Sequence, residues 1–371
     1  MGPTSGAGSP SVVVSGRRPA MLRRWGGVVA ALTVLTACSG SDGPSRPSNP
    51  ERPSTTTTVG SGSSSDATGA SGVTGVAGAT IATIAPTSTT TTVRPAAGCT
   101  AGTTTARYRS LPGVEARFTS LDVHNPRGAC GLPVWVWVHG GGYRIGDKAN
   151  QMADKVRLAA ERGWLLVSVN YRLTDPADPT AARFPDHYDD VAAAVAWIRS
   201  NIAPFGGDAN RIALFGHSAG ADIVSNVAVV PAHLAAHGLT TVVLDCVGPL
   251  DTAGFDKPAA LATGTAGAER EEAMWEAALG SDPDWRMSTS ATLRIDPARR
   301  VPPMLVTVRG APSRRAIAEG LAAAVRATGA EVVVVEARGL THNEVNSRIG
   351  TAGDTVMTPP IVGFLDRCFA G

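Results

Sequence analysis

Two glycine-rich stretches carry residue types that could perform nucleophilic chemistry. The first is His139-Gly140-Gly141-Gly142-Tyr143, and the second is Gly216-His217-Ser218-Ala219-Gly220. The second has the G-x-S-x-G pattern of a nucleophile elbow, a sharp strand-to-helix turn that exposes a serine hydroxyl. Glycines flank the serine because the turn is strained and a Cβ there would clash with the neighbouring backbone. Ser218 is therefore the predicted nucleophile.

Backbone N–H groups near the serine could bind the oxyanion that forms when a serine attacks an ester carbonyl. Ala219 directly follows the serine, and its N–H begins a helix and would point toward that oxyanion. The glycine loop offers two further donors. The sequence therefore predicts an oxyanion hole formed by Gly141, Gly142 and Ala219.

The serine also needs a base, and His342 is the histidine that fits. It follows the apolar run 332–335 by a short loop, and in the fold that carries this elbow the base comes after the serine in chain order. Other histidines have different expected places. We expect His139 to brace the glycine loop, His217 to pack inside the elbow, and His187 to be solvated at the polar start of a helix.

Strand-like and helix-like segments alternate from Val134 onward. Apolar runs of strand length precede both glycine motifs, and further runs lie at 163–170, 240–244, 304–308 and 332–335. Helical periodicity is found at 150–162, 186–201 and 314–328. This alternation predicts an α/β fold with a mostly parallel central sheet and helices on both faces. We expect antiparallel edge strands within 104–123, and an excursion over the active-site end within 251–300 that is either a small cap or an ordinary crossover.

The chain resembles bacterial carboxylesterases of the α/β-hydrolase superfamily, near the hormone-sensitive-lipase-like esterases. Besides the two glycine motifs, the resemblance rests on Val169-Asn170-Tyr171-Arg172-Leu173, Phe205-Gly206-Gly207-Asp208 and Thr341-His342. It is densest over 133–220 and thin after Val247. The resemblance implies an α/β-hydrolase fold and serine ester hydrolysis through an acyl-enzyme, without a cofactor. The expected substrates are small to medium acyl esters.

The acid of the triad is where this sequence departs from the family's pattern. Most members carry an aspartate after the strand that precedes the histidine strand, but here the run 304–308 is followed by Arg309 to Arg314 with no carboxylate. Some relatives place the acid after the strand before that one. Asp251 is accordingly the predicted acid, and Asp256, Asp245 and Glu344 stay open as alternatives.

Two other functions stay open. An amidase or formamidase would use the same triad on a different leaving group, and a non-catalytic hydrolase-fold protein would bind a ligand or partner at the cell surface. The missing late aspartate favours the second. No metal is predicted, because no H-E-x-x-H motif or paired Cys/His spacing occurs, and no dinucleotide motif follows a strand. A net charge of +2 and the lack of a basic cluster in the catalytic part argue against nucleic acid as a partner.

The N-terminal region divides into an expected signal peptide, residues 1–38, and an expected disordered tether, residues 39–103, which leaves 104–371 for the catalytic domain. Met21 is an alternative start, followed by a positive flank and a short apolar stretch. That stretch ends in Leu35-Thr36-Ala37-Cys38, which resembles the lipobox of bacterial lipoproteins and implies lipid attachment to Cys38. We therefore expect an exported protein anchored in the cell membrane, or a secreted one if the lipobox is not used.

Four further cysteines remain, an even number that suits an oxidising compartment. Three connectivities are possible. We favour Cys99 with Cys130, which flank the early strands, and Cys246 with Cys368. The alternative for Cys246 is a small residue of the core.

Overall fold

The computed structural model describes residues 98–370. The predicted signal peptide, the lipidation site Cys38 and most of the predicted tether lie outside the described residues. The folded domain begins earlier than expected, because Cys99 is disulfide-bonded and Gly102 and Thr103 belong to the first strand. The last residues assigned to the tether are thus part of the domain.

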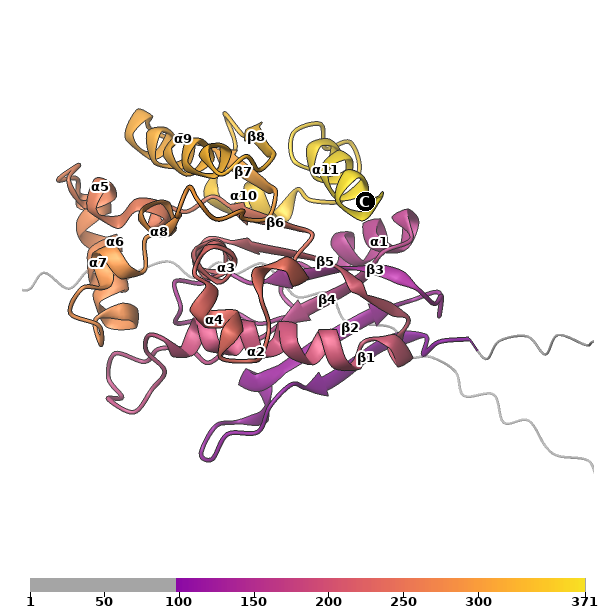
Figure 1. Ribbon diagram of the computed structural model, residues 1–371. Helices are drawn as coiled ribbons and strands as arrows, with labels where there is room; N and C mark the ends of the chain where they lie inside the picture. The colour runs from indigo at the N-terminus through magenta and orange to yellow at the C-terminus, as the bar shows by residue number, and fades with distance from the viewer. Residues whose placement is uncertain (1–97, 371) are drawn as a thin grey trace, which may run out of the picture. The chain divides into compact units, whose positions relative to one another are not determined.

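An 8-stranded sheet forms the centre of the domain (Figure 1). Its strands are β1 (Gly102–Arg107), β2 (Ser120–Asn125), β3 (Leu132–Val138), β4 (Leu165–Val169), β5 (Gly207–His217), β6 (Cys246–Leu250), β7 (Met304–Val308) and β8 (Val332–Glu336). They lie in the order β1-β2-β4-β3-β5-β6-β7-β8. Strand β2 runs antiparallel to β1 and β4, and all pairs from β4 to β8 are parallel. The predicted mostly parallel sheet with early antiparallel strands is confirmed.

Helices connect the strands and cover the sheet. The α-helices are α1 (Ala153–Arg162), α2 (Asp186–Asn201), α3 (Ala219–Val229), α4 (Pro231–Ala235), α5 (Lys257–Leu261), α6 (Ala266–Leu279), α7 (Trp285–Ser288), α8 (Ala291–Arg294), α9 (Pro312–Ala327), α10 (His342–Ser347) and α11 (Thr358–Ala370). Short 3₁₀ helices occupy η1 (Ala116–Thr119), η2 (Ala203–Phe205), η3 (Thr241–Val243) and η4 (Gly254–Asp256). Among residues 98–370, no helix has the length and apolar character needed to cross a membrane.

Strand β3 shows how the sheet separates two cores, because successive side chains of a strand point to opposite faces. Val134, Val136 and Val138 pack in the core that holds the buried residues of α2, α3 and α9. Trp135 and Trp137 pack in a second core, with buried residues of α1 and α11. Helices α1 and α11 lie side by side at the right of Figure 1, where Arg162 pairs with Asp366. Both faces of the sheet are therefore covered, as predicted.

The strand expected at 240–244 is wrong. That segment contains the 3₁₀ helix η3, and the strand β6 begins at Cys246 instead. Pro249 lies inside β6, although proline lacks the N–H that a central strand uses. Within the described residues β6 pairs with β7 at Val247 and Met304, so on that side Pro249 interrupts no pairing. The shift puts Asp251 directly at the carboxyl end of β6.

The two disulfides are the pairs that the sequence analysis favours. Cys99 is bonded to Cys130, and Cys246 is bonded to Cys368. The second bond joins the start of β6 to α11 on one face of the sheet. Cys246 is fully buried but disulfide-bonded, so the alternative of an unbonded core cysteine is wrong.

The excursion between β6 and β7 forms a small cap made of α5 to α8 (left side of Figure 1). Trp275 and Trp285 bury this segment against the main core. A Cβ on Gly142 would lie 2.9 Å from Sδ of Met274, so α6 contacts the glycine loop. The cap therefore borders the predicted active site.

Candidate active site

Ser218 lies in the sharp turn between β5 and α3. Its backbone has φ 59° and ψ −120°, a strained conformation that is uncommon for residues other than glycine. The flanking glycines are required by contact: a Cβ on Gly216 would lie 2.4 Å from the carbonyl oxygen of Gly220. A Cβ on Gly220 would lie 2.4 Å from the carbonyl oxygen of Val138. This close packing explains the G-x-S-x-G pattern.

Ser218, His342 and Asp251 form a continuous hydrogen-bonded line. The Ser218 hydroxyl donates to Nε2 of His342 across 2.9 Å. Nδ1 of the same ring donates to Oδ2 of Asp251 across 2.6 Å. The three side chains come from the carboxyl ends of β5, β6 and β8, which parallel strands bring to one edge of the sheet.

The other carboxylates considered for the acid have different partners. Asp245 accepts the backbone N–H of Ile212 at the start of β6, at the opposite end of the strand. Asp256 caps α5, and Glu344 closes the capping box of α10. Asp251 is therefore the carboxylate that meets His342, although the segment after β7 contains none.

The charge of Asp251 is strongly stabilised even though only 3% of the residue is exposed. Burial opposes its charge, but the hydrogen bond from His342 and the positive charges of Arg314 and Arg309 outweigh burial. Together they hold the pKa of Asp251 well below its usual range. The carboxylate is thus ionised wherever the protein is folded near neutral pH, as a triad acid must be.

The glycine loop lies against the nucleophile. A Cβ on Gly140 would approach within 2.9 Å of Cβ of Ser218, and Gly141 and Gly142 have φ values of 111° and 60°. Within residues 98–370, the N–H groups of Gly141, Gly142 and Ala219 donate no hydrogen bond to the protein. All three predicted donors are thus available for a ligand.

A buried polar network fixes this loop to the elbow helix, and the sequence analysis missed it. Tyr143, which follows the three glycines, donates its hydroxyl hydrogen to Asp222 of α3. Tyr188 donates to the same carboxylate across 2.9 Å, and Lys257 of the cap forms an ion pair with it at 2.9 Å. All four side chains are fully buried. The tyrosine of the glycine motif was the available signal, but its partners are far away in sequence.

The histidines around the site differ from expectation in one case. His139 stacks on Tyr171 with 4.4 Å between ring centroids and braces the loop, and His217 donates from Nε2 to the carbonyl oxygen of His342 across 2.8 Å. The expectation that His187 is solvated is wrong. It is fully buried 2.9 Å from the Thr174 hydroxyl, and burial lowers its pKa to about 3. The reason is tertiary packing, because the rings of Tyr143 and Tyr171 and the hydroxyl of Thr174 contact the imidazole.

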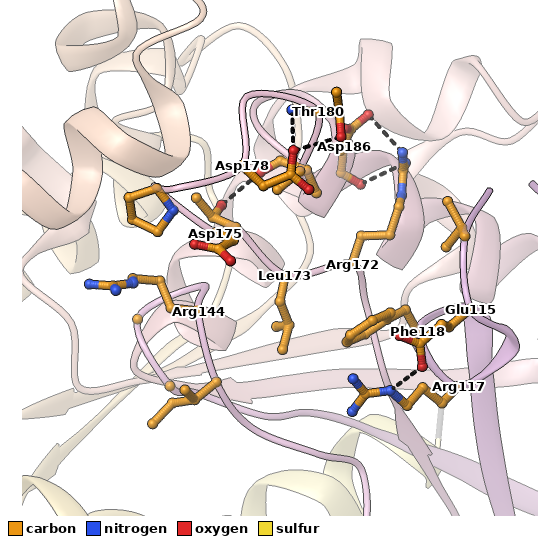
Figure 2. Close-up of a pocket in the computed structure, with 18 of the residues that line it drawn as sticks. Glu115, Arg117, Phe118, Arg144, Arg172, Leu173, Asp175, Asp178, Thr180 and Asp186 are labelled. Atoms are coloured by element: carbon orange, nitrogen blue, oxygen red, sulfur yellow. Dashed lines mark hydrogen bonds and ion pairs between the residues drawn. The ribbon is translucent and has the colours of Figure 1, made fainter.

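Two cavities meet at the glycine loop. The smaller, of about 410 Å³, is lined by Ser218, His342 and the loop itself. The larger, of about 940 Å³, shares Gly141, Gly142 and Ile145 with it. Figure 2 shows Leu173 of the larger cavity between Arg144 on one side and Arg172 on the other. A substrate bound across the loop could thus place one portion in each cavity.

His217, Asp251 and His342 offer ligand atoms within 4.8 Å of one another, an arrangement that could in principle bind a metal. Both oxygens of Asp251 already accept hydrogen bonds from arginines. The positive charge of Arg309 and Arg314 disfavours a cation at the same carboxylate. The cluster is therefore better suited to proton transfer than to metal binding.

A buried lysine supports the helix that carries His342. Nζ of Lys155 donates to the carbonyl oxygens of Gln151 and Asn346, at 3.1 and 3.0 Å, and only 1% of the residue is exposed. Burial lowers the pKa of Lys155 to about 7, although Asp154 acts in the opposite direction. Lys155 thus joins α1 to the last turn of α10.

Replacing Lys155 with methionine should remove part of the pH dependence of stability. The unfolded chain holds this proton up to a pH of about 10.4, whereas the folded protein releases it near its pKa of about 7. The unfolded state then binds more protons between these values, so Lys155 makes the free energy of unfolding rise with pH, by at most about 1.4 kcal/mol per pH unit. Urea unfolding of both proteins from about pH 7 to 10 measures this; parallel pH curves would contradict it.

A family model described as the alpha/beta hydrolase fold matches residues 135–346, which span the glycine loop, the elbow and His342. The chain belongs to this family. Its α/β-hydrolase sheet is also similar to that of a thermophilic carboxylesterase cloned from a metagenomic library, with a TM-score of 0.53, 23% identity, and coverage of 68% of this chain and 82% of that one. An esterase structure from Rhizomucor miehei has a TM-score of 0.57, 21% identity, and coverage of 73% and 86%. At these identities the likeness shows the fold.

Curated relatives of this α/β-hydrolase match over a shorter region. A para-nitrobenzyl esterase of Bacillus subtilis is 36% identical over 107 residues, which cover 27% of this chain and 22% of that one. A fumonisin B1 esterase of Sphingopyxis macrogoltabida is 37% identical over 123 residues, with coverage of 30% and 23%. The chain thus spans about a fifth of the length of these relatives.

Proposed function

We propose that this α/β-hydrolase is a serine carboxylesterase with Ser218 as nucleophile, His342 as base and Asp251 as acid. One observation carries the proposal: the hydroxyl of Ser218 lies 2.9 Å from His342, which lies 2.6 Å from Asp251, beside three free N–H groups. Nucleophile, base and orienting acid are thus in hydrogen-bond contact. The relatives named as esterases agree with this chemistry.

The reaction follows from these contacts. Oγ of Ser218 attacks the ester carbonyl carbon while Nε2 of His342 takes the hydroxyl proton, and Asp251 stabilises the resulting imidazolium. The N–H groups of Gly141, Gly142 and Ala219 bind the oxyanion. The imidazolium then returns its proton to the leaving alkoxide, which departs as the alcohol and leaves an acyl-enzyme. Water, deprotonated by the same imidazole, attacks the acyl-enzyme and releases the carboxylic acid and free Ser218.

The larger cavity favours esters of small to medium acyl chains. Leu173 and Phe118 give it an apolar portion, but Arg144, Asp175 and Asp178 stand on its wall. A long alkyl chain would have to desolvate these charged groups without offering them hydrogen bonds, which costs free energy. The apolar contact available to an acyl chain is therefore limited in length.

A series of p-nitrophenyl esters from acetate to laurate, compared with the p-nitroanilide of the preferred acid, tests this function. We expect the highest kcat/KM on short and medium esters. Turnover of the anilide should be at least about 100-fold slower, because p-nitroaniline is a poorer leaving group than p-nitrophenol. A fluorophosphonate should label Ser218, as mapped by peptide mass spectrometry. Faster hydrolysis of the anilide would point to an amidase, and absence of both turnover and labelling would point to a binding protein.

We also propose, from sequence alone, that the mature protein is held at the outer face of the cell membrane by lipid on Cys38. Full-length protein expressed in a bacterium with lipoprotein processing should partition into the detergent phase of Triton X-114. Cys38→Ser should move to the aqueous phase, because a single thiol carries the lipid. Equal partitioning of the two proteins would favour an ordinary secretory signal.

A further inference from the structure

The triad acid stands between two arginines that the reaction described above does not use. Asp251 directly follows β6, and its backbone φ is 55°. Its side chain is buried near the end of β7 and the start of α9. Nε of Arg309 donates to Oδ2 across 2.5 Å, and Nε of Arg314 donates to Oδ1 across 3.2 Å. His342 donates to Oδ2 as well. Each oxygen of the carboxylate is therefore held by an arginine.

Arg309 is the first residue after β7, where most members of the family that the sequence resembles carry the acid. The Arg309 side chain instead contacts Asp251, the acid that follows the neighbouring strand β6. Arg314 lies in the first turn of α9, and its Nη1 also donates to Glu271 of α6 across 2.9 Å. The two arginines thus tie the acid to the sheet, to α9 and to the cap.

We propose that Arg309 and Arg314 are positioning residues that orient the relocated acid of the triad toward His342. The proposal rests on the esterase function proposed above. An aspartate on a left-handed backbone position needs its side chain fixed by partners, since its rotamers can otherwise turn away from the imidazole. Arginine suits this role because its planar guanidinium holds a carboxylate in a defined direction.

The arginines also offset part of the negative charge that Asp251 presents to the His342 imidazolium. When His342 takes the serine proton, it faces a carboxylate whose charge is already offset by Arg309 and Arg314. The other titratable or charged groups near this centre are His217 of β5, which packs 4.5 Å from the His342 ring, Lys155 of α1 and Glu271 of α6. Removing an arginine should therefore have two effects: the acid is held less firmly, and the protonated imidazole is favoured.

The test compares Arg309→Met, Arg309→Lys and Arg314→Met with the wild type across pH. Loss of a charge-assisted hydrogen bond should lower kcat/KM at the optimum by roughly 10- to 100-fold in each methionine variant. The acid limb of the kcat/KM profile should move upward by about one pH unit, because a positive charge has left the site. Arg309→Lys should keep the wild-type acid limb and recover part of kcat/KM.

Arg338→Met is the matched control. Arg338 is 72% exposed in its side chain and pairs with Glu336, away from Asp251, so its replacement should change neither the rate nor the profile. A purely structural role of Arg309 would lower thermal stability while the acid limb stays in place. Wild-type kcat/KM within about 2-fold and an unmoved acid limb in both methionine variants would overturn the proposal.

A second measurement does not depend on turnover. Proton NMR can follow the His342 Nδ1 proton that is hydrogen-bonded to Asp251, and its pH transition should move upward in Arg309→Met and stay fixed in Arg338→Met. An identical transition in wild type and Arg309→Met would overturn the proposal. If the wild type hydrolysed no ester but the NMR transition moved, the esterase function would fail and the positioning role would stand.

Discussion

Replacing Ser218 with alanine should lower kcat for ester hydrolysis by about 10⁶-fold, because the attacking atom is removed and His342 has no proton to accept. The residual rate should reflect binding and the oxyanion donors alone. Alanine is smaller than serine and keeps the Cβ that the elbow already holds, so the fold should persist. Initial rates with a chromogenic acetate ester, together with a circular dichroism melt, measure both effects.

Ser347→Ala is the control for this variant. Ser347 ends the helix that begins with His342, and its replacement should leave kcat within about 2-fold of the wild type. Fluorophosphonate labelling should disappear in Ser218→Ala and persist in Ser347→Ala. Substantial turnover or labelling in Ser218→Ala would remove Ser218 from the chemistry.

Replacing Asp251 with asparagine should lower kcat by about 10⁴-fold, because an amide can donate to His342 and stabilise the wrong tautomer. The ring would then present an N–H to Ser218 in place of a lone pair. The effect should exceed that of either arginine variant, since the acid contacts the base directly. Stopped-flow or plate-reader rates over a range of ester concentrations separate kcat from KM.

Asp256→Asn is the matched control for the acid. Asp256 caps α5 through the N–H of Ala259, and asparagine is an equally good cap. Its kcat should therefore match that of the wild type. Near-normal kcat in Asp251→Asn would require another carboxylate, and a large loss in Asp256→Asn would point to that residue.

The acid shows the limit of prediction from sequence. Asp251 was the preferred candidate, but the strand before it was predicted at the apolar run 240–244. In the structure that strand is β6, which begins at Cys246 and ends directly before Asp251. Sheet pairing decided otherwise, because residues 246–250 align with β5, and the pairing of β6 with β7 is at Val247 and does not involve Pro249. Local preference was overridden by a partner strand distant in sequence.

The sequence also did not predict which residues several of the polar and charged side chains contact. His187 was predicted to be solvated at the polar start of a helix, yet it is fully buried. Arg309 stands where most of the family carries the acid, and its side chain donates a hydrogen bond to Asp251. Lys257 and Asp222 are 35 residues apart in the chain and form a buried pair that secures the glycine loop through Tyr143. Such contacts depend on which segments the cap and the sheet bring together.

The sequence alone was enough to predict the reacting groups and their framework: a serine in a glycine-flanked turn, a glycine loop that offers N–H donors, a histidine after the last strand and a mostly parallel α/β sheet. These features are local, because steric limits on glycine turns and the periodicity of side chains act over a few residues. The tertiary structure decided which carboxylate meets His342, what holds that carboxylate and which polar side chains are buried. Those outcomes depend on distances between residues that lie far apart along the chain, and only the packed sheet and cap fix such distances.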